Sequence, residues 1–146
     1  MKIMEYITHS EKETKELLLN ILDLKPSSKK ATVFALEGEL GSGKTTFAKG
    51  LEEVLKIKIK SPTFNIIKRY EIDFNGFKNF YHIDFYRVKS VSGLEFEDIL
   101  NKKENLIFIE WGSNIEESLP KDIKKICFEY LDKDKRKITY EGNKNN

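Results

Sequence analysis

The sequence predicts an α/β sandwich with a mainly parallel core sheet and antiparallel hairpin additions. Short apolar runs, typical of buried strands, lie between segments with helical periodicity, and a glycine-punctuated loop joins one such run to a helix. Asn75-Gly76 is a strong hairpin turn signal, and the stretch starting at Asp132 is turn-prone as well, so two antiparallel pairs are expected. The length of 146 residues suits a single domain covering residues 1–146.

The first third of the chain predicts a helix, a strand and a second helix. Ser10 and Glu13 have the spacing of a capping box, and apolar residues then recur at helical spacing until the chain approaches Pro26. The run 31–36 is almost entirely apolar, as in a buried strand. After a glycine-rich loop, the segment 44–55 places its apolar residues on one helical face.

The rest of the chain predicts mostly strands, with one short helix among them. Alternating and apolar runs bounded by turn residues favour strands, whereas the acidic segment before Leu100 favours a helix. In chain order the expected elements are a strand over 64–72, a strand over 80–86, an acidic helix over 93–100, an apolar strand over 106–109 and two strands within 123–140.

Composition and charge exclude several classes of protein. Hydrophobic residues make up 39% of the chain and the net charge is only +2 with both signs interspersed, so we expect a folded protein without a strong direct contact to nucleic acid. The single cysteine, Cys127, cannot form an internal disulfide, and a buried structural thiol is expected. Without an apolar run of about 18 residues or a cleavage-site pattern, no membrane association and a cytoplasmic location are expected.

The glycine-punctuated loop carries a complete phosphate-binding pattern, G-x-x-x-x-G-K-[ST]. Glycines let successive backbone N–H groups point at a phosphate, and the start of the next helix adds its dipole. Lys44 offers a positive charge to the β- and γ-phosphates, and the Thr45 hydroxyl can ligate Mg²⁺. An ordinary glycine-rich turn is the alternative. The expected nucleotide-binding residues are Gly38, Glu39, Leu40, Gly41, Ser42, Gly43, Lys44, Thr45 and Thr46.

Two acidic residues are candidates for the magnesium site. Glu110 directly follows the apolar run 106–109, and nucleotide hydrolases often hold Mg²⁺ with a carboxylate in that position. Strand alternation puts His82, Asp84 and Tyr86 on one face, where Asp84 can orient water or bind Mg²⁺. Alternatively, Glu110 is an exposed carboxylate at the end of a strand, and His82, Asp84 and Tyr86 lie on the solvent-facing side of an antiparallel strand. His82 by itself is expected to be a structural histidine with satisfied hydrogen bonds.

Two further residues have open interpretations. Thr63, within Ser61-Pro62-Thr63-Phe64, follows the predicted phosphate-binding helix, where a switch segment can sense the γ-phosphate. A plain turn before a strand explains it equally well. Trp111 follows Glu110, and its pattern favours a core position over an exposed partner anchor.

Four motifs in this order and spacing resemble the TsaE family, over nearly the whole chain. They are the phosphate-binding segment from Gly38, Ser61-Pro-Thr-Phe, His82-Ile-Asp-Phe-Tyr-Arg and Ile109-Glu-Trp. The resemblance implies a P-loop NTPase three-layer sandwich that binds ATP and Mg²⁺ and hydrolyses ATP slowly. It also implies a role in threonylcarbamoyladenosine (t6A) modification of tRNA, in which hydrolysis resets the TsaB–TsaD heterodimer. The TsaD side is the expected contact, and tRNA is involved only indirectly.

The same resemblance implies roles for individual residues. Lys44 would bind phosphate, Thr45 and Glu110 would ligate Mg²⁺, and Asp84 would be an essential acid near the γ-phosphate and a further metal candidate. Thr63 would belong to the switch and Trp111 would be functional. The expected adenine contacts are Thr8, Ser10 and Arg136. The sequence departs from the family pattern at Glu39, where many relatives have aspartate, and at Gly112, where some have proline.

Three other functions are alternatives to the ATPase. A small-molecule P-loop kinase needs an arginine-bearing lid, and the chain offers only Arg69, Arg87 and Arg136 without an arginine-rich segment. A GTPase would read guanine with Asn-Lys-x-Asp, and the stretch Asn101-Lys-Lys-Glu104 fails at its last position. A nucleotide-gated binding module without productive hydrolysis needs the same residues as the ATPase, so only the partner dependence of the rate separates the two.

Overall fold

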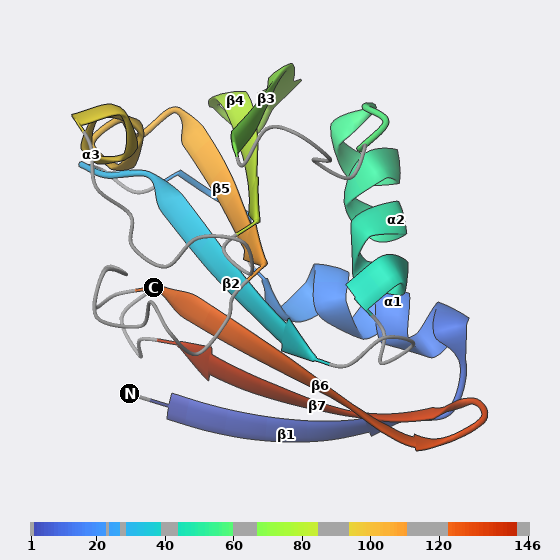
Figure 1. The fold of residues 1–146 in the computed structure, drawn as a ribbon. Helices are drawn as coiled ribbons and strands as arrows, with labels where there is room; N and C mark the ends of the chain where they lie inside the picture. Colours follow the sequence, from blue (N-terminus) through green and yellow to red (C-terminus); the bar gives the residue numbers. More distant parts are fainter. Residues whose placement is uncertain are drawn as a thin grey trace. The chain divides into compact units, whose positions relative to one another are not determined.

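The computed structural model describes residues 2–22, 24–26, 29–38, 44–59, 67–84, 94–110 and 123–142. Its elements in chain order are β1 (Lys2–Thr8), α1 (Glu11–Ile21), β2 (Thr32–Gly38), α2 (Lys44–Leu55), β3 (Ile67–Phe74), β4 (Phe77–Asp84), α3 (Leu94–Leu100), β5 (Asn105–Glu110), β6 (Lys124–Asp132) and β7 (Lys135–Gly142) (Figure 1). The strands hydrogen-bond in the order β1-β7-β6-β2-β5-β4-β3. This mixed sheet, with a hairpin near each end, confirms the predicted α/β class with antiparallel additions.

The contacts of the chain group it into two compact units that share strand β2. The first unit comprises Met1–Asp23, Leu36–Ile59 and Lys124–Asn146, and the second comprises Leu24–Ala35 and Lys60–Ile123. Strand β2 therefore begins in the second unit and ends in the first. Among the described elements, the first unit contains α1, α2 and the β6–β7 hairpin, and the second contains α3 and the β3–β4 hairpin.

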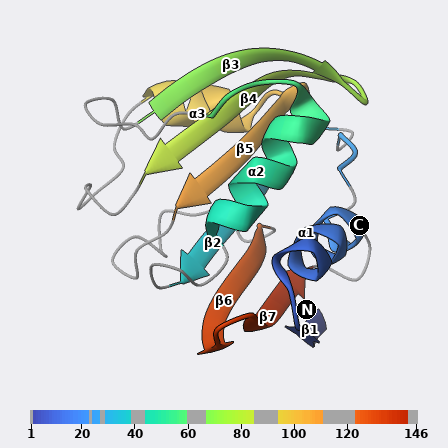
Figure 2. The same cartoon turned by 90° about the vertical axis from the view of Figure 1, so that its right-hand side faces the viewer.

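In the first unit, an antiparallel ribbon of β1, β7 and β6 accompanies two helices. Thr8 of β1 lies opposite Arg136 of β7, and the two strands of the predicted C-terminal pair are joined as expected (Figure 2). Helix α1 begins where the capping box predicts, because the Ser10 hydroxyl accepts the Glu13 backbone N–H at 3.0 Å. Phe47 of α2 lies near Phe128 of β6, with 6.4 Å between ring centroids.

Ion pairs also join the two helices of this unit. Lys15 of α1 contacts the carboxylate of Glu53 on α2, and Lys49 of α2 lies 3.7 Å from Glu11 of α1. Both side chains of the second pair are more than half exposed, so this pair contributes little to stability. Apolar burial at Leu18 and Leu51, each about 1% exposed, contributes more to holding these helices.

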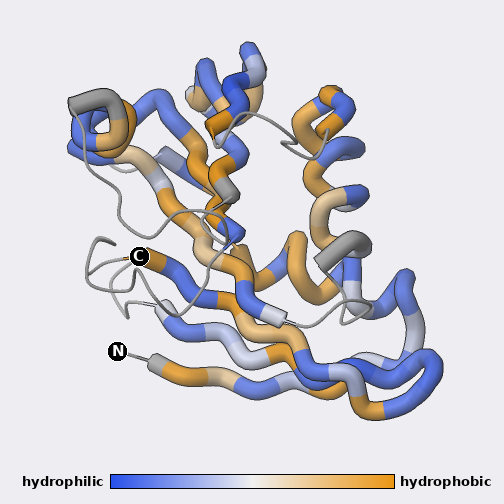
Figure 3. Tube along the Cα trace, in the orientation of Figure 1, coloured by the Kyte–Doolittle hydropathy of each residue, from blue (hydrophilic) through white to orange (hydrophobic). Residues whose placement is uncertain are grey.

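In the second unit, the β3–β4 hairpin turns at Asn75-Gly76, as predicted. Both turn residues have positive φ, 50° and 97°, which the tight two-residue hairpin requires and which asparagine and glycine tolerate. Strand β4 then runs parallel to β5, and helix α3 packs its apolar residues against them. The buried core of this unit contains Val33, Ala35, Ile83, Phe96, Ile99, Ile107, Ile109 and Ile123. Figure 3 shows the hydrophobic colour along much of β5.

Strand β1 was not among the predicted elements, and both strands of the β3–β4 hairpin differ from their predicted bounds. Strand β4 begins at Phe77, where residue 80 was expected. In β1 the apolar residues stand in two pairs, Ile3-Met4 and Tyr6-Ile7, on either side of Glu5, so the sequence shows neither the alternation nor the unbroken apolar run that signals a strand. The first hairpin strand spans Ile67–Phe74, where 64–72 was expected, because the Asn75-Gly76 turn sets its end. In the part of the chain that the structure describes, no helix has the length and apolar character needed to cross a membrane.

Candidate functional site

The phosphate-binding motif occupies a strand-to-helix connection in the first unit. Strand β2 ends at Gly38 and helix α2 begins at Lys44, which is the context that the motif requires. The first turn of α2 carries no acidic residue, so no carboxylate there opposes an anion at the positive end of the helix. Thr46 is half-buried in this first turn. Outside the described residues lie Glu39, Leu40, Gly41, Ser42, Gly43 and the side chains of Lys44 and Thr45.

Buried apolar contacts hold both elements that flank the motif. Strand β2 is buried from Thr32 to Leu36, and it becomes half-buried at Glu37 and Gly38. In helix α2, Phe47 and Leu51 are 2% and 1% exposed, so the helix is fixed by its core-facing side. These contacts fix the end of β2 at Gly38 and the start of α2 at Lys44, so the backbone N–H groups at these two positions have defined orientations.

The two candidate metal ligands of the second unit end neighbouring strands. Asp84 and Glu110 are direct partners in the parallel β4–β5 register. The Glu110 side chain is 30% exposed, so its carboxylate is neither fully buried nor fully solvated. Mg²⁺ prefers carboxylate oxygens and usually binds through one or two carboxylates and several waters. The predicted pair therefore fits a magnesium ion in its chemistry and in its register; the side chain of Asp84 lies outside the described part.

His82 differs from its prediction. It is only 4% exposed, its Nε2 lies 3.6 Å from Glu110 Oε1, and its ring centroid is 4.8 Å from that of Phe108. Neither ring nitrogen has a hydrogen-bond partner among the described residues. The expectation of a satisfied structural histidine is therefore wrong, and so is a solvent-facing position for this residue. The sequence signal that pointed here was a polar residue between apolar ones, two positions before a carboxylate.

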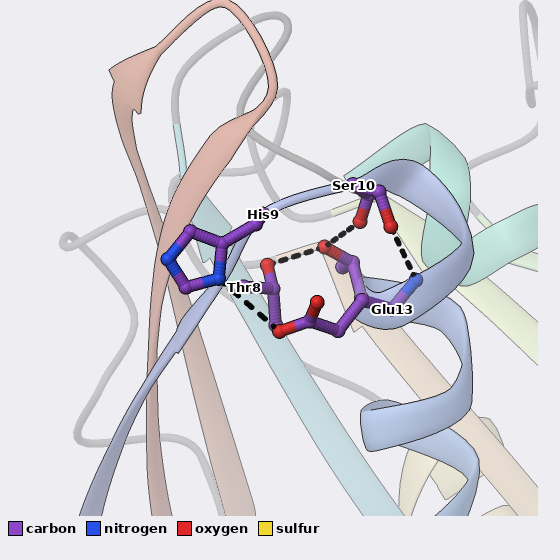
Figure 4. Close-up of polar contacts among 5 residues, drawn as sticks. Thr8, His9, Ser10 and Glu13 are labelled. Carbon is purple, nitrogen blue, oxygen red and sulfur yellow. Dashed lines mark hydrogen bonds and ion pairs between the residues drawn. The ribbon is translucent and has the colours of Figure 1, made fainter.

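Two of the predicted adenine contacts join strand β1 to helix α1. Thr8 is 2% exposed and its hydroxyl lies 2.5 Å from that of Thr14 (Figure 4). Thr14 donates its one hydroxyl proton to the Ser10 carbonyl oxygen at 3.1 Å, so Thr8 must be the donor to Thr14. The Ser10 hydroxyl meanwhile accepts the Glu13 N–H. His9 Nδ1 lies 3.4 Å from Glu13 Oε1 on the exposed side.

The third predicted adenine contact, Arg136, lies beside these residues. It is the register partner of Thr8 across β1 and β7. Its guanidinium donates to the carbonyl oxygens of Asp132, Lys133 and Lys135 at 2.7, 3.3 and 3.0 Å, and it stacks 4.6 Å from the centroid of the Tyr130 ring. The structure thus gathers Thr8, Ser10 and Arg136 in one region and shows what each does for the fold. An adenine contact by any of them stays a prediction.

Of the remaining candidates, Thr63 and Trp111 are not among the described residues, whereas Cys127 is. Within the described ranges, no three His, Cys, Asp or Glu side chains gather as a metal-binding group. Cys127 is half-buried, where full burial was expected, and its Sγ lies 4.0 Å from Glu37 Oε2. Burial chiefly, then the charges of Glu37 and Glu141, raise the pKa of the Cys127 thiol.

Comparison with known proteins gives consistent matches over this chain. A family model for threonylcarbamoyl adenosine biosynthesis protein TsaE matches residues 8–138. The tRNA threonylcarbamoyladenosine biosynthesis protein TsaE of Bacillus subtilis is 37% identical over 143 residues, which cover 96% of this chain and 86% of that protein. The protein of the same name from Aquifex aeolicus is 38% identical over 140 residues, which cover 93% of this chain and 94% of that protein.

A solved structure agrees with the sequence matches. The crystal structure of YdiB from Bacillus subtilis superposes with a TM-score of 0.71 at 33% identity, and the match covers 99% of this chain and 88% of that one. The fold is therefore shared along with the sequence. Because the family model and full-length relatives above 30% identity agree over most of the chain, this chain belongs to the TsaE family.

Proposed function

We propose that this chain is the Mg²⁺-dependent ATPase subunit of the machinery that installs t6A in tRNA. The observation that carries the proposal is a complete phosphate-binding motif between β2 and α2 in a member of the TsaE family. The curated relatives bear the name of tRNA threonylcarbamoyladenosine biosynthesis proteins, which supports the same pathway for this chain. Because tRNA modification of this kind takes place where tRNA is used, we place the chain in the cytoplasm. We also propose that residues 1–146 form one domain.

Each site residue has a role in this proposal. Backbone N–H groups from Gly38 to Thr46 surround the phosphates, and Lys44 neutralises the β- and γ-phosphate charge. The Thr45 hydroxyl and the Glu110 carboxylate hold Mg²⁺, with Asp84 beside Glu110 as a further metal candidate. When bound, Mg²⁺ supplies a Lewis acid that stabilises charge on the phosphate oxygens. Asp84 orients the water that attacks the γ-phosphate.

The remaining residues bind the base and report the state of the nucleotide. Thr8, Ser10 and Arg136 are the proposed adenine contacts, and their proximity in the structure supports grouping them. Thr63 belongs to a switch segment that responds to the γ-phosphate. ATP binding then sets the affinity for the TsaB–TsaD heterodimer, on its TsaD side, and slow hydrolysis releases or resets that complex. Contact with tRNA is only indirect.

The test is ATP hydrolysis with Mg²⁺, measured with and without the cognate TsaB–TsaD pair. We expect slow hydrolysis by the chain alone, a higher rate with the pair, and loss of both rates in Glu110→Ala. The matched control is Glu104→Ala, because Glu104 also lies beside β5 but at the opposite end of that strand. This variant should retain both rates. If Glu110→Ala matches the unmodified chain in both conditions, the assignment of the site is wrong.

Two alternative functions give different outcomes in the same assay. A nucleotide-gated binding module would bind Mg²⁺–ATP and the partner pair, but the pair would not raise phosphate release. A small-molecule kinase would transfer labelled γ-phosphate to an added acceptor and release little inorganic phosphate. Release of phosphate that rises with the pair, without a labelled acceptor, would support the ATPase.

A further inference from the structure

His82 is a buried histidine whose ring nitrogens make no hydrogen bond within the described part of the chain. The His82 side chain is 5% exposed, and neither Nδ1 nor Nε2 finds a partner among the described residues. Leaving a buried polar group without a hydrogen bond is unfavourable, and an apolar side chain of similar shape would avoid that cost. His82 also lies on a strand whose other buried residues are all apolar among those described: Phe77, Phe80 and Ile83. The imidazole therefore has a use that an apolar ring would not serve.

Geometry points to the carboxylate of Glu110 as the group that His82 serves. His82 Nε2 and Glu110 Oε1 are 3.6 Å apart, which is slightly longer than a hydrogen bond. The ring of Phe108 packs against the imidazole at 4.8 Å between centroids and restricts its rotation. Phe108 is also the register partner of His82 across β4 and β5. The ring contact thus holds the imidazole with its Nε2 beside the Glu110 carboxylate.

We propose that His82 is a positioning residue that holds one oxygen of Glu110 and thereby directs the carboxylate toward Mg²⁺. This inference rests on the proposed function, because it assumes that Glu110 is a metal ligand. A neutral imidazole has one donor and one acceptor nitrogen, so the Nε2–H tautomer is the form that donates to a carboxylate. Groups that hydrogen-bond a metal ligand fix its orientation, and their loss typically weakens metal binding about 10- to 100-fold.

The first measurement needs neither metal nor nucleotide. The chain has two histidines, so a ring-nitrogen correlation spectrum of the ¹⁵N-labelled protein resolves into two sets, and His9→Gln assigns them. His82 should show the Nε2–H tautomer in the unmodified protein, and Glu110→Ala should change its nitrogen shifts. His9, whose side chain is 66% exposed, serves as the internal reference and should not respond. An unchanged His82 spectrum in Glu110→Ala would overturn the proposed contact.

The second measurement asks whether that contact matters for the metal. The amide nitrogen of a glutamine can reach the position of imidazole Nε2, whereas that of an asparagine reaches only the position of Nδ1. We therefore expect His82→Asn and His82→Phe to raise the Mg²⁺ concentration for half-maximal binding of a fluorescent ATP analogue by about tenfold or more. His82→Gln should stay within about threefold of the unmodified chain. Tyr81→Phe, on the neighbouring position of β4, is the matched control and should not change it.

Three outcomes separate a positioning role from a structural one and from failure of the proposed function. Equal Mg²⁺ dependence in all His82 variants, in a chain that binds Mg²⁺–nucleotide, overturns the positioning role even if the variants unfold more easily. Effects of His82→Asn that persist unchanged in a Glu110→Ala background also overturn it, because they do not pass through Glu110. If the unmodified chain shows no Mg²⁺-dependent nucleotide binding, the proposed function fails, and the ligand-free spectrum still decides whether His82 holds Glu110.

Discussion

Lys124 donates a hydrogen bond from its ammonium group to the backbone carbonyl oxygen of Leu22 at 3.3 Å, across 102 positions of the chain. Leu22 is the C-cap of helix α1, and the last turn of that helix has no basic residue of its own. Lys124 is 7% exposed, so its charge interacts with the negative end of the helix at low solvent screening. This contact joins the start of β6 to the end of α1 within the first unit.

Replacing Lys124 with methionine keeps most of the aliphatic chain but removes the ammonium donor. Because a hydrogen bond from a charged group is worth about 1.5–3 kcal/mol, Lys124→Met should lower the free energy of unfolding by about that amount. Lys135→Met, at an exposed position at the start of β7, is the control and should change it by less than about 0.5 kcal/mol. Urea denaturation measures both. Equal stability of the two variants would show that the ammonium contact does not stabilise the fold.

Signals that lie close together in the chain predicted much of this fold. Ser10 was predicted as a helix cap from residues within one turn, and the Asn75-Gly76 turn was predicted from two adjacent residues whose backbone needs are unusual. The buried strand β2 and the amphipathic helix α2 followed from periodicity. Such signals depend on local geometry, so a single sequence carries them in full.

Features that depend on distant partners were not predictable in this way. Strand β1 exists because β7 pairs with it from the other end of the chain, and its own residues alternate weakly. That neither ring nitrogen of His82 finds a hydrogen-bond partner among the described residues depends on which side chains surround it after folding, and strand alternation does not predict them. The adjacency of Asp84 and Glu110 likewise follows from the β4–β5 register.

Thr14 links strand β1 to helix α1 through two hydrogen bonds, to Thr8 and to the Ser10 carbonyl. Thr14→Val keeps the shape and removes both, so it should lower the free energy of unfolding by about 1–2 kcal/mol. In the Thr14→Val background, Thr8→Val should lower the free energy of unfolding only slightly further, because the Thr8 hydroxyl has already lost its partner. Thermal and urea unfolding of the single and double variants test this double-mutant cycle, with Thr139→Val as control. Strictly additive losses would show that the Thr8–Thr14 contact does not stabilise the fold.

Lys44 should contribute to nucleotide binding through charge, whereas Lys49 on the same helix should not. Lys44→Ala is expected to weaken Mg²⁺–ATP binding at least about tenfold, which corresponds to about 1.4 kcal/mol. Ligand binding raises the apparent stability of the folded state, so the shift in Tm on adding Mg²⁺–ATP should be lost in Lys44→Ala. Lys49→Ala should retain the full shift, because this side chain is 63% exposed and pairs with Glu11. A full shift in Lys44→Ala would remove the phosphate role from this lysine.

Cys127 reports on the charge of Glu37, one residue before the phosphate-binding motif. Burial is the main cause that raises the pKa of the Cys127 thiol, and the carboxylate of Glu37 is the next. A raised pKa keeps the thiol protonated in the folded state, so its reaction with a thiol reagent should begin at higher pH than in the unfolded chain. The protonated thiol therefore contributes to the free energy of unfolding. This contribution is fully present below the thiol pKa of the unfolded chain, about 8.5, and is lost as the pH rises through the higher pKa of the folded chain.

Glu37→Gln removes one negative charge and should move the pH dependence of this thiol reaction toward lower pH, although burial keeps it above that of the unfolded chain. Glu129→Gln, an exposed position on the same strand as Cys127, is the matched control and should leave it unchanged. The measurement is the rate of thiol modification of the folded protein across alkaline pH. If Glu37→Gln and Glu129→Gln both give the same profile as the unmodified chain, the charge of Glu37 does not act on Cys127.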